Sequence, residues 1–318
     1  MRLCFVGYGS IAEEHAKAFR ELPDVEFGWV VGRDPAATEA FARQWGFTRW
    51  TLDLDEALSS DVHAVVITSP SDLHAAQAIR SLHAGKHVLA EIPVATSLTD
   101  AEAVAAAART SGRRVQVAHT QRYEAPLVEL RRRIAAGDLH PHHVVCRWFF
   151  LRRNNVNWKG RQRTWTDNLL WHHACHVVDA ALWLLEGSQP GGGTEVRAQF
   201  GPAHPELGIP LDLDLQFRSG ARLVTIAMSY NSPWPRHDYF VIGEEAGLEF
   251  REGKLWSNDG PVFEPEGPNR AIPNQNREWI SAICEQREAA VNVEAVLPAM
   301  RVLQAAQDQL ARAAAVQP

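Results

Sequence analysis

Three histidines stand close together in the middle of the chain, within residues 171–176. The apolar pattern around them predicts a helix that begins near Thr166. On such a helix His172 and His176 lie one turn apart on one face, whereas His173 points elsewhere and can still neighbour His176. Two imidazoles on one face suit proton transfer at neutral pH. We therefore predict that His176 is a general base and that His172 assists it.

Two other interpretations of these histidines stay open. The spacing His172-x-x-x-His176 can bind a metal ion, but no third ligand stands at a recognisable spacing, and no Glu is placed as in the zinc proteases. We therefore predict no metal site. One or more of the histidines can instead be buried structural hydrogen-bond donors, and this interpretation is favoured for His173.

A second chemical signal is a glycine-rich turn near the start of the chain. An apolar run at residues 3–6 is followed by Gly7-Tyr8-Gly9-Ser10-Ile11 and then by a helical pattern. The glycines allow a tight turn and close approach of a pyrophosphate, while the N-terminus of the new helix attracts its charge. Because a second apolar run at 25–31 completes a strand-helix-strand unit, we predict that Gly7, Gly9, Ser10 and Ile11 bind a dinucleotide. A glycine turn without a ligand is the alternative.

The end of the second predicted strand bears on the choice between NADP and NAD. An Asp or Glu there would bind the ribose hydroxyls and repel a 2′-phosphate, but this chain has Gly32-Arg33-Asp34. Arg33 can offer a planar set of charged donors to the phosphate, which favours NADP. In the alternative interpretation, Arg33 is a solvated surface residue, Asp34 binds the ribose, and the cofactor is NAD.

The elements that must position these residues fall into two patterns. Up to about residue 120, short apolar strands alternate with helices, which predicts a doubly wound parallel sheet, that is, a Rossmann domain at 1–120. From Gln121, close-spaced strands with hairpin turns predict a second α+β domain at 121–318 with an open, mostly antiparallel sheet. An open sheet with one helical face leaves its other face for a partner, so we expect a homodimer or homotetramer.

Composition excludes several classes of function. The 318 residues carry a formal charge of −6, which argues against general binding to nucleic acid or to anionic membranes. The apolar run at the start is too short for a signal peptide and no segment approaches the length of a membrane span, so we expect a cytoplasmic protein.

The four cysteines are far apart, which favours reduced thiols over disulfides or a zinc cluster.

With these features in place, the whole chain resembles the glucose-fructose oxidoreductase and inositol dehydrogenase family. The resemblance rests on the glycine turn, on the runs 84–88 and 91–93, and on the helix that ends in 176–179. It implies a Rossmann domain and an open-sheet domain, with the nicotinamide and the substrate meeting between them. It also implies that further residues bind the cofactor, namely Ser69, Pro70, His74, Glu91 and Pro93.

Two residues depart from the usual pattern of the family. Ile92 stands where the family usually has a Lys, and His172 stands where it usually has an Asp. With the runs 90–93, 119–123, 149–154, 164–173 and 201–209, these departures resemble one subgroup, the 4-carboxy-2-hydroxymuconate-6-semialdehyde dehydrogenases of aromatic catabolism. The resemblance implies oxidation, with NADP, of a cyclic hemiacetal to 2-pyrone-4,6-dicarboxylate, or oxidation of a close analogue.

A small carboxylated substrate needs fixed cations in a chain without a general positive field. The candidates are Arg122, Arg152, Arg153 and Lys159, with His173 as a further substrate contact. One or two of these cations can instead cover the surface or pair with acids. Two rival functions remain: an NAD(P)-dependent sugar or inositol-type dehydrogenase, and a non-catalytic NADP-binding protein. No covalent step through Cys175 is expected, because this cysteine lies inside a helix without an activating neighbour.

Overall fold

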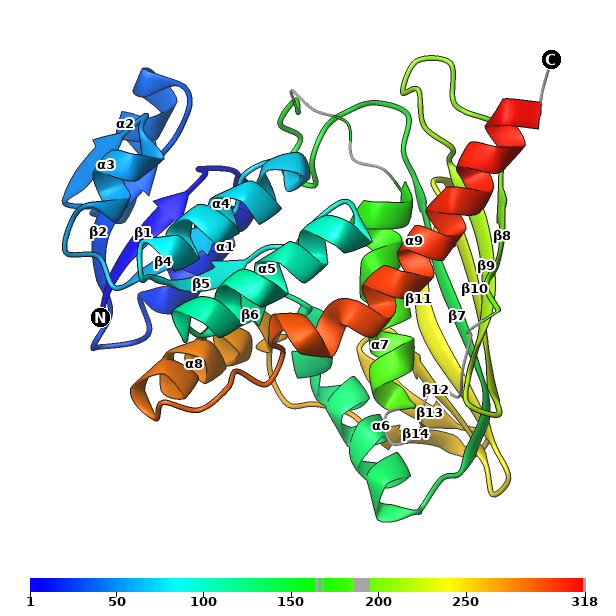
Figure 1. Cartoon of the computed structure of the whole chain (residues 1–318). Helices are drawn as coiled ribbons and strands as arrows, with labels where there is room; N and C mark the ends of the chain where they lie inside the picture. The colour runs from blue at the N-terminus through cyan, green and yellow to red at the C-terminus, as the bar shows by residue number, and fades with distance from the viewer. Residues whose placement is uncertain (164–165, 167–168, 186–194, 317–318) are drawn as a thin grey trace. The chain divides into compact units, whose positions relative to one another are not determined.

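The computed structural model describes residues 1–163, 166, 169–185 and 195–316, with side chains up to residue 312. The chain forms two compact units (Figure 1). Unit 1 contains Met1–Thr120 and Ala271–Leu297, and unit 2 contains Gln121–Arg270 and Pro298–Pro318.

Unit 1 is built on a parallel sheet with the strand order β3-β2-β1-β4-β5-β6. Its strands are β1 (Arg2–Val6), β2 (Glu26–Val31), β3 (Arg49–Thr51), β4 (Ala64–Ile67), β5 (His87–Ala90) and β6 (Val115–Val117). Every residue of the central strand β4 is fully buried, as expected where helices cover both faces of a parallel sheet. The predicted Rossmann sheet is confirmed.

The helices of unit 1 begin and end where the sequence supplies capping residues. They are α1 (Ser10–Phe19), α2 (Pro35–Trp45), α3 (Leu54–Leu58), η1 (Ser71–Leu73), α4 (His74–His83), α5 (Leu98–Ser111), α8 (Ala271–Cys284) and the start of α9 (Val293–Val316). In α5, Ser97 accepts a hydrogen bond from the backbone of Asp100, and Gly112 closes the helix in the left-handed conformation. Helix α4 packs against α5, and α1 packs against α8 (Figure 1).

The predicted domain division is wrong for residues 271–297. Helix α8 buries Trp279 and Ala282 in the core of unit 1, and the Trp279 ring lies 6.1 Å from the ring of Phe19 on α1. Burial of an aromatic side chain of this size holds α8 in the first unit although the chain has already passed through the second. The boundary near residue 120 agrees with the prediction.

Unit 2 is built on an open sheet with the strand order β14-β13-β12-β11-β7-β10-β9-β8. The strands are β7 (Pro141–Leu151), β8 (Arg197–Phe200), β9 (Asp212–Ser219), β10 (Arg222–Ser229), β11 (Asn231–Gly243), β12 (Gly247–Arg251), β13 (Lys254–Ser257) and β14 (Gly260–Phe263). Among the described strands of this sheet, β7 and β10 alone pair in parallel, so the predicted, mostly antiparallel sheet is confirmed.

The helices of unit 2 lie on one side of this sheet (Figure 1). They are η2 (Thr120–Tyr123), α6 (Ala125–Ala136), the π-helix η3 (Leu169–Ala174), α7 (Cys175–Leu184) and the part of α9 from Pro298. Strand β9 shows why one face is covered. Its residues alternate between buried Leu213, Leu215 and Phe217 and exposed Asp214, Gln216 and Arg218.

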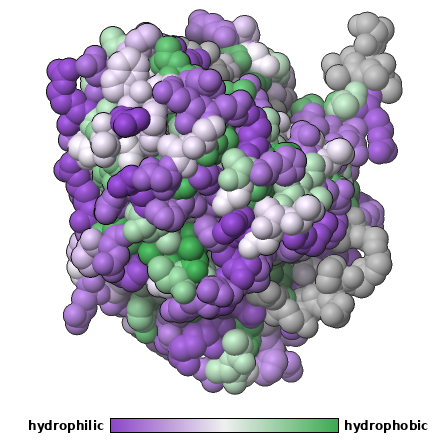
Figure 2. All heavy atoms as spheres, turned by 60° about the vertical axis from the view of Figure 1, so that its left-hand side comes forward, coloured by the Kyte–Doolittle hydropathy of each residue, from purple (hydrophilic) through white to green (hydrophobic). Residues whose placement is uncertain are grey.

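Surface polarity agrees with the charged composition. On the face shown in Figure 2, hydrophobic residues form small separate patches between hydrophilic ones. Among the helices of the described residues, none is long and apolar enough to span a bilayer.

Candidate active site

The glycine turn connects β1 to α1 and is shaped for close approach of a ligand. Gly7 has a φ of 110°, and a Cβ at this position would lie 2.7 Å from the carbonyl oxygen of Thr68. Gly9 is the N-cap of α1 and has no side chain to cap it, and a Cβ there would meet no atom within 4 Å. The turn therefore leaves room in front of a helix N-terminus, which fits the pyrophosphate of a dinucleotide.

The end of β2 has no room for a carboxylate at residue 32. A Cβ on Gly32 would lie 1.9 Å from the hydroxyl oxygen of Thr38 and 2.6 Å from the ring of Tyr8. The exposed side chain of Asp34 accepts a hydrogen bond from the backbone N–H of Ala37 at 2.8 Å and so caps α2. Arg33 is exposed at the same edge. After β2, the chain thus presents the cation Arg33. The carboxylate of Asp34 is already used to cap α2.

Two loops at the carboxyl ends of β4 and β5 are tied together by His74. This buried imidazole lies 2.8 Å from the carbonyl oxygen of Ser69 through Nε2 and 2.8 Å from that of Pro93 through Nδ1. The hydroxyl of Ser69 in turn donates to Gln77 at 2.5 Å. His74 therefore supports the predicted cofactor loops, and its two nitrogens already contact protein.

Glu91 is held by a network that the sequence did not predict. Its Oε1 lies 2.7 Å from Nε2 of His15, and its Oε2 accepts a hydrogen bond from the backbone N–H of Ile92 at 3.1 Å. Nδ1 of His15 lies 3.0 Å from Oδ1 of Asn276. The fully buried His15 thus links α1, α8 and the loop after β5. The only signal in the sequence was its place on the buried face of the first helix.

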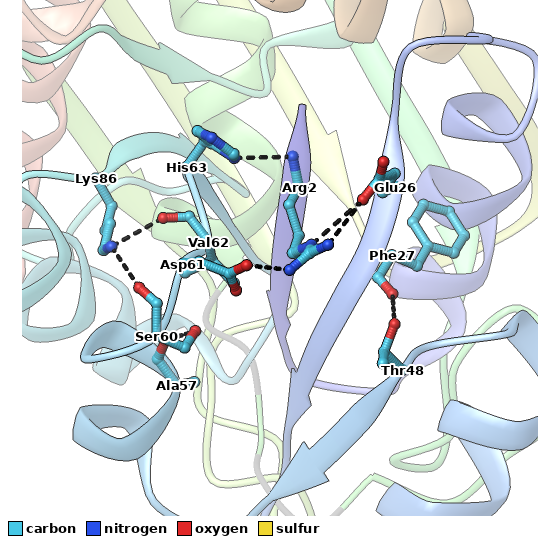
Figure 3. Close-up of polar contacts among 10 residues, drawn as sticks. All are labelled: Arg2, Glu26, Phe27, Thr48, Ala57, Ser60, Asp61, Val62, His63 and Lys86. Atoms are coloured by element: carbon cyan, nitrogen blue, oxygen red, sulfur yellow. Dashed lines mark hydrogen bonds and ion pairs between the residues drawn. The ribbon is translucent and has the colours of Figure 1, made fainter.

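A second polar cluster of unit 1 lies at the opposite edge of the sheet. Figure 3 shows Arg2, at the start of β1, contacting Glu26 and Asp61, while Lys86 donates to the backbone carbonyls of Ser60 and Val62. These groups line or adjoin a hollow at the amino ends of the strands. Nucleotides bind at the carboxyl ends of parallel strands, so we assign this cluster a structural role in joining β1, β2 and the segment before β4.

In unit 2, the predicted histidine helix begins with a π-helix. Residues Leu169–Ala174 form η3, and α7 continues from Cys175. A π-turn holds more residues than an α-turn, so the neighbours differ from those of a regular helix. The ring of His172 lies 4.6 Å from that of His173. The rings of His173 and His176 lie 5.0 and 5.8 Å from that of Trp148 on β7, so the three histidines form one aromatic cluster.

A further histidine, absent from the sequence prediction, completes this cluster. His237 on β11 pairs directly with Trp148 in the sheet, and their rings stack at 4.4 Å with an angle of 24°. Nε2 of His237 lies 3.0 Å from Nε2 of Gln121, whose Oε1 accepts a hydrogen bond from the hydroxyl of Tyr239. Burial lowers the pKa of His237 to about 4 and raises that of Tyr239 well above its usual value. Both side chains are therefore neutral at pH 7.

The predicted cations of the loop after β7 differ in their surroundings. Arg152 is buried, with its guanidinium 5.3 Å above the ring of Tyr230, and it donates to Oδ1 of Asn155 at 2.8 Å. The hydroxyl of Tyr230 contacts Nδ1 of His173, which places Arg152 one side chain away from the histidines. This contact also agrees with the structural role favoured for His173.

Arg153 and Lys159 lie farther out in the same loop. Arg153 donates to the backbone oxygen of Arg152 at 2.9 Å and to the side chain of Asn231 at 3.0 Å, and both Arg153 and Lys159 are exposed. Residues 164–165 and 167–168, which carry part of the resemblance and part of the predicted start of the histidine helix, lie outside the described residues.

The substrate role predicted for Arg122 needs correction. Its Nε and Nη2 donate to the two carboxylate oxygens of Asp179 at 2.8 and 2.6 Å, and both side chains are buried. A bidentate pair of this kind neutralises the guanidinium and occupies its fork. Arg122 is therefore a residue that fixes α7 to η2. The sequence could not show this, because the partners are far apart along the chain.

Glu124, at the N-cap of α6, is a half-buried carboxyl close to Tyr239. Burial raises its pKa to about 7. Groups of three His, Cys, Asp or Glu side chains that could hold a metal ion are absent from the described residues.

Comparison with known proteins agrees with this geometry. Residues 1–119 match the model of an oxidoreductase family with an NAD-binding Rossmann fold, and residues 128–255 match that of the C-terminal part of bacterial oxidoreductases. The chain is 35% identical over 309 residues to 4-carboxy-2-hydroxymuconate-6-semialdehyde dehydrogenase of Sphingobium sp., covering 95% of this chain and 96% of that protein. The chain belongs to the glucose-fructose oxidoreductase and inositol dehydrogenase family.

Two further proteins resemble this chain in sequence or in fold. An inositol 2-dehydrogenase of Rhizobium meliloti is 31% identical over 145 residues, which is 46% of this chain and 44% of that protein. The structure of levoglucosan dehydrogenase in complex with NADH and levoglucosan has a TM-score of 0.84 at 18% identity, and the match covers 98% of this chain and 96% of that one. Family membership makes this chain an NAD(P)-dependent oxidoreductase that acts on a CH–OH group.

Proposed function

We propose that this chain oxidises a small carboxylated semialdehyde in its cyclic hemiacetal form, with NADP as the hydride acceptor. The observation that carries the proposal is the cluster of His172, His173 and His176 beside a buried arginine, Arg152. The similarity to 4-carboxy-2-hydroxymuconate-6-semialdehyde dehydrogenase supports the same substrate class, with 2-pyrone-4,6-dicarboxylate as the product.

The reaction requires removal of one proton and one hydride from the same carbon–oxygen unit. The hemiacetal O–H bond breaks as His176 takes the proton, and the C–H bond of the same carbon breaks as hydride leaves. The exocyclic C–OH thereby becomes the C=O of the lactone, and the ring C–O bond remains single. Bound NADP supplies the hydride acceptor. His172 orients the cluster through His173, because the two rings are in contact. A positioned base of this type contributes about 10²- to 10⁴-fold to the rate.

Arg152 is the group best suited to bind a carboxylate of the substrate. Its guanidinium is buried, lies above the ring of Tyr230 and donates a hydrogen bond to the side chain of Asn155. A charged hydrogen bond to a carboxylate that is shielded from water contributes about 1.5–3 kcal/mol. Arg153 and Lys159, which are exposed, add positive charge at the rim. The proposal does not require Arg122, whose guanidinium pairs with Asp179.

The preference for NADP rests on the residues that follow β2. Gly32 removes the carboxylate that would repel a 2′-phosphate, Asp34 caps α2, and Arg33 is exposed beside them. The other predicted cofactor residues, from Gly7 to Ile11 and in the loops of Ser69, Pro70, Glu91 and Pro93, lie at the carboxyl ends of β1, β4 and β5.

The proposal is tested by measuring reduction of NADP and of NAD at 340 nm with two substrate classes. The semialdehyde is generated enzymatically, and myo-inositol and scyllo-inositol represent the neutral polyols of the inositol dehydrogenase relative. We expect turnover of the semialdehyde with NADP and none above background with the polyols. Turnover of inositol alone would support the polyol alternative, and turnover of neither would contradict the proposal.

We also propose that the chain forms a homodimer or homotetramer through the sheet face of unit 2 that faces away from α7. This face carries the partly exposed side chains of Leu223 and Ile242 beside Arg147, which pairs with Asp238. Apolar groups next to charges of both signs allow a face to pair with a second copy of itself. Light scattering should give two or four times the chain mass of 35.4 kDa, and Leu223→Glu should lower it to one.

A further inference from the structure

His237 is a histidine of the aromatic cluster to which the proposed mechanism gives no role. It lies on β11, on the helix-covered side of the sheet, stacked on Trp148 at 4.4 Å. The ring of Trp148 also has the candidate base His176 at 5.8 Å and His173 at 5.0 Å. His237 therefore belongs to the same cluster as the base, although it is 61 residues away in the sequence.

The hydrogen bonds of Gln121 fix which nitrogen of His237 carries the proton. The hydroxyl of Tyr239 donates to Oε1 of Gln121, so the amide nitrogen of Gln121 faces His237 at 3.0 Å. An amide nitrogen can only donate, and Nε2 of His237 must therefore be the bare, accepting nitrogen. A neutral imidazole with a bare Nε2 carries its proton on Nδ1. The buried side chains of Gln121 and Tyr239 thus select one tautomer.

The charge of His237 is fixed as well. Asp238, on the same strand, favours the protonated form, but burial outweighs it and lowers the pKa to about 4. Asp238 itself pairs with Arg147 at 2.8 Å. The other titratable groups near the ring are Tyr239, which stays protonated, and His173 and His176, which also contact Trp148.

The Nδ1 atom is on the accessible side of the ring. Within the described part of the chain Nδ1 of His237 contacts no hydrogen-bond acceptor, and it is not sealed from solvent. A buried polar nitrogen needs a hydrogen-bond partner, whereas a nitrogen that is open to solvent is available to a bound molecule. Here one nitrogen is paired with Gln121, and the other presents an N–H at the surface of the cluster.

We propose that His237 is a substrate-contacting residue whose Nδ1–H donates a hydrogen bond to a carbonyl or carboxylate oxygen of the substrate. Gln121 and Tyr239 are its positioning residues, since they hold the imidazole in the donating tautomer. The inference rests on the proposed function, because it places the substrate beside His176. In this arrangement His237 adds a neutral hydrogen-bond donor to the positive charge of Arg152. The pair favours binding of an oxygen-rich, anionic ring over binding of a neutral polyol.

The tautomer is tested without any substrate. In the full chain with ¹⁵N-labelled histidine, two-dimensional NMR distinguishes a protonated Nδ1 from a protonated Nε2, and His237→Gln identifies the signal by its loss. We expect a neutral imidazole with Nδ1–H and a bare Nε2 that does not titrate between pH 5.5 and 8.5. A protonated Nε2, or a midpoint inside this range, would overturn the inference. Gln121→Met should abolish the single tautomer.

Two variants of His237 then separate donation to the substrate from support of Gln121. His237→Asn keeps an N–H near the position of Nδ1, and His237→Gln keeps a polar atom near the position of Nε2. We expect His237→Gln to raise KM for the semialdehyde about tenfold and His237→Asn to raise it less, with KM for NADP unchanged in both. The reverse order would show that His237 acts only through Gln121 and would refute the contact.

Failure of this inference can be distinguished from failure of the proposed function. If His176→Asn abolishes turnover while both His237 variants behave as the unaltered chain, only the contact of His237 is refuted. If the unaltered chain does not turn over the semialdehyde, the proposed function fails, and the NMR result still decides whether Gln121 selects the tautomer.

Discussion

The glycine turn of unit 1 and the histidine cluster of unit 2 build their sites from different parts of the chain. At the glycine turn the important features are backbone features: the positive φ of Gly7, the missing side chain of Gly9 and the N-terminus of α1. In the cluster they are side chains that come from β7, β11, η3 and α7. A single side-chain replacement should therefore affect the second site far more than the first.

The largest effect is expected from His176→Asn. Loss of the base should lower kcat about 10²- to 10⁴-fold, while the affinity for NADP, measured by fluorescence titration, stays within about twofold. His143→Asn is the matched control, because this histidine lies on the same sheet, contacts Thr225 and is not part of the cluster. Equal losses of turnover and of NADP binding would contradict the division between the two sites.

The second largest effect is expected from Asp179→Asn, which leaves Arg122 buried beside a neutral partner. Breaking a buried ion pair from one side costs about 3–5 kcal/mol, so the urea midpoint should fall markedly. Glu195→Gln, which breaks an exposed pair with Arg197, should leave the midpoint unchanged. If Asp179→Asn were as stable as the unaltered chain, the pair would not be what fixes the histidine helix.

A third effect depends on pH and concerns Glu124. Because folding raises its pKa from 4.5 to about 7, the folded state holds this proton more tightly than the unfolded state. Its contribution to stability is complete below pH 4.5 and is lost as the pH rises to about 7. At pH 8, Glu124→Gln should therefore have a higher urea midpoint than the unaltered chain, with a free energy of unfolding larger by at most about 3 kcal/mol. At pH 4 the two midpoints should be equal.

Glu129, on the same helix, gives a control of opposite sign. Hydrogen bonds from Arg132 and Arg133 lower its pKa to about 2, so its contribution is present above pH 4.5 and is lost as the pH falls towards 2. Glu129→Gln should be less stable than the unaltered chain at pH 8. A variant of Glu124 that is also less stable at pH 8 would show that its carboxylate is favourably bound in the folded state.

The same contrast explains how much the sequence could predict. The turn from Gly7 to Ile11 was predictable because its conformation depends on adjacent residues, and the alternation of strands and helices predicted both sheets. The stacking of His237 on Trp148 depends on the register of β11 against β7, and the partner of Arg122 lies on a helix 57 residues away. Composition and residue spacing do not indicate which distant residues become neighbours in this way. The π-helix was also missed, because its residues are ordinary helix formers.

The smallest effect is expected in the cofactor site of unit 1, because this site depends mainly on backbone groups. Arg33→Ala removes one exposed side chain but leaves the glycine turn and the N-terminus of α1, so KM for NADP should rise only about tenfold and KM for NAD should not change. Arg43→Ala is the control, because this exposed arginine lies on α2 and pairs with Glu39. If NADP and NAD were affected equally, Arg33 would not distinguish them, and the 2′-phosphate would have to be bound by the backbone or by another side chain at the end of β2.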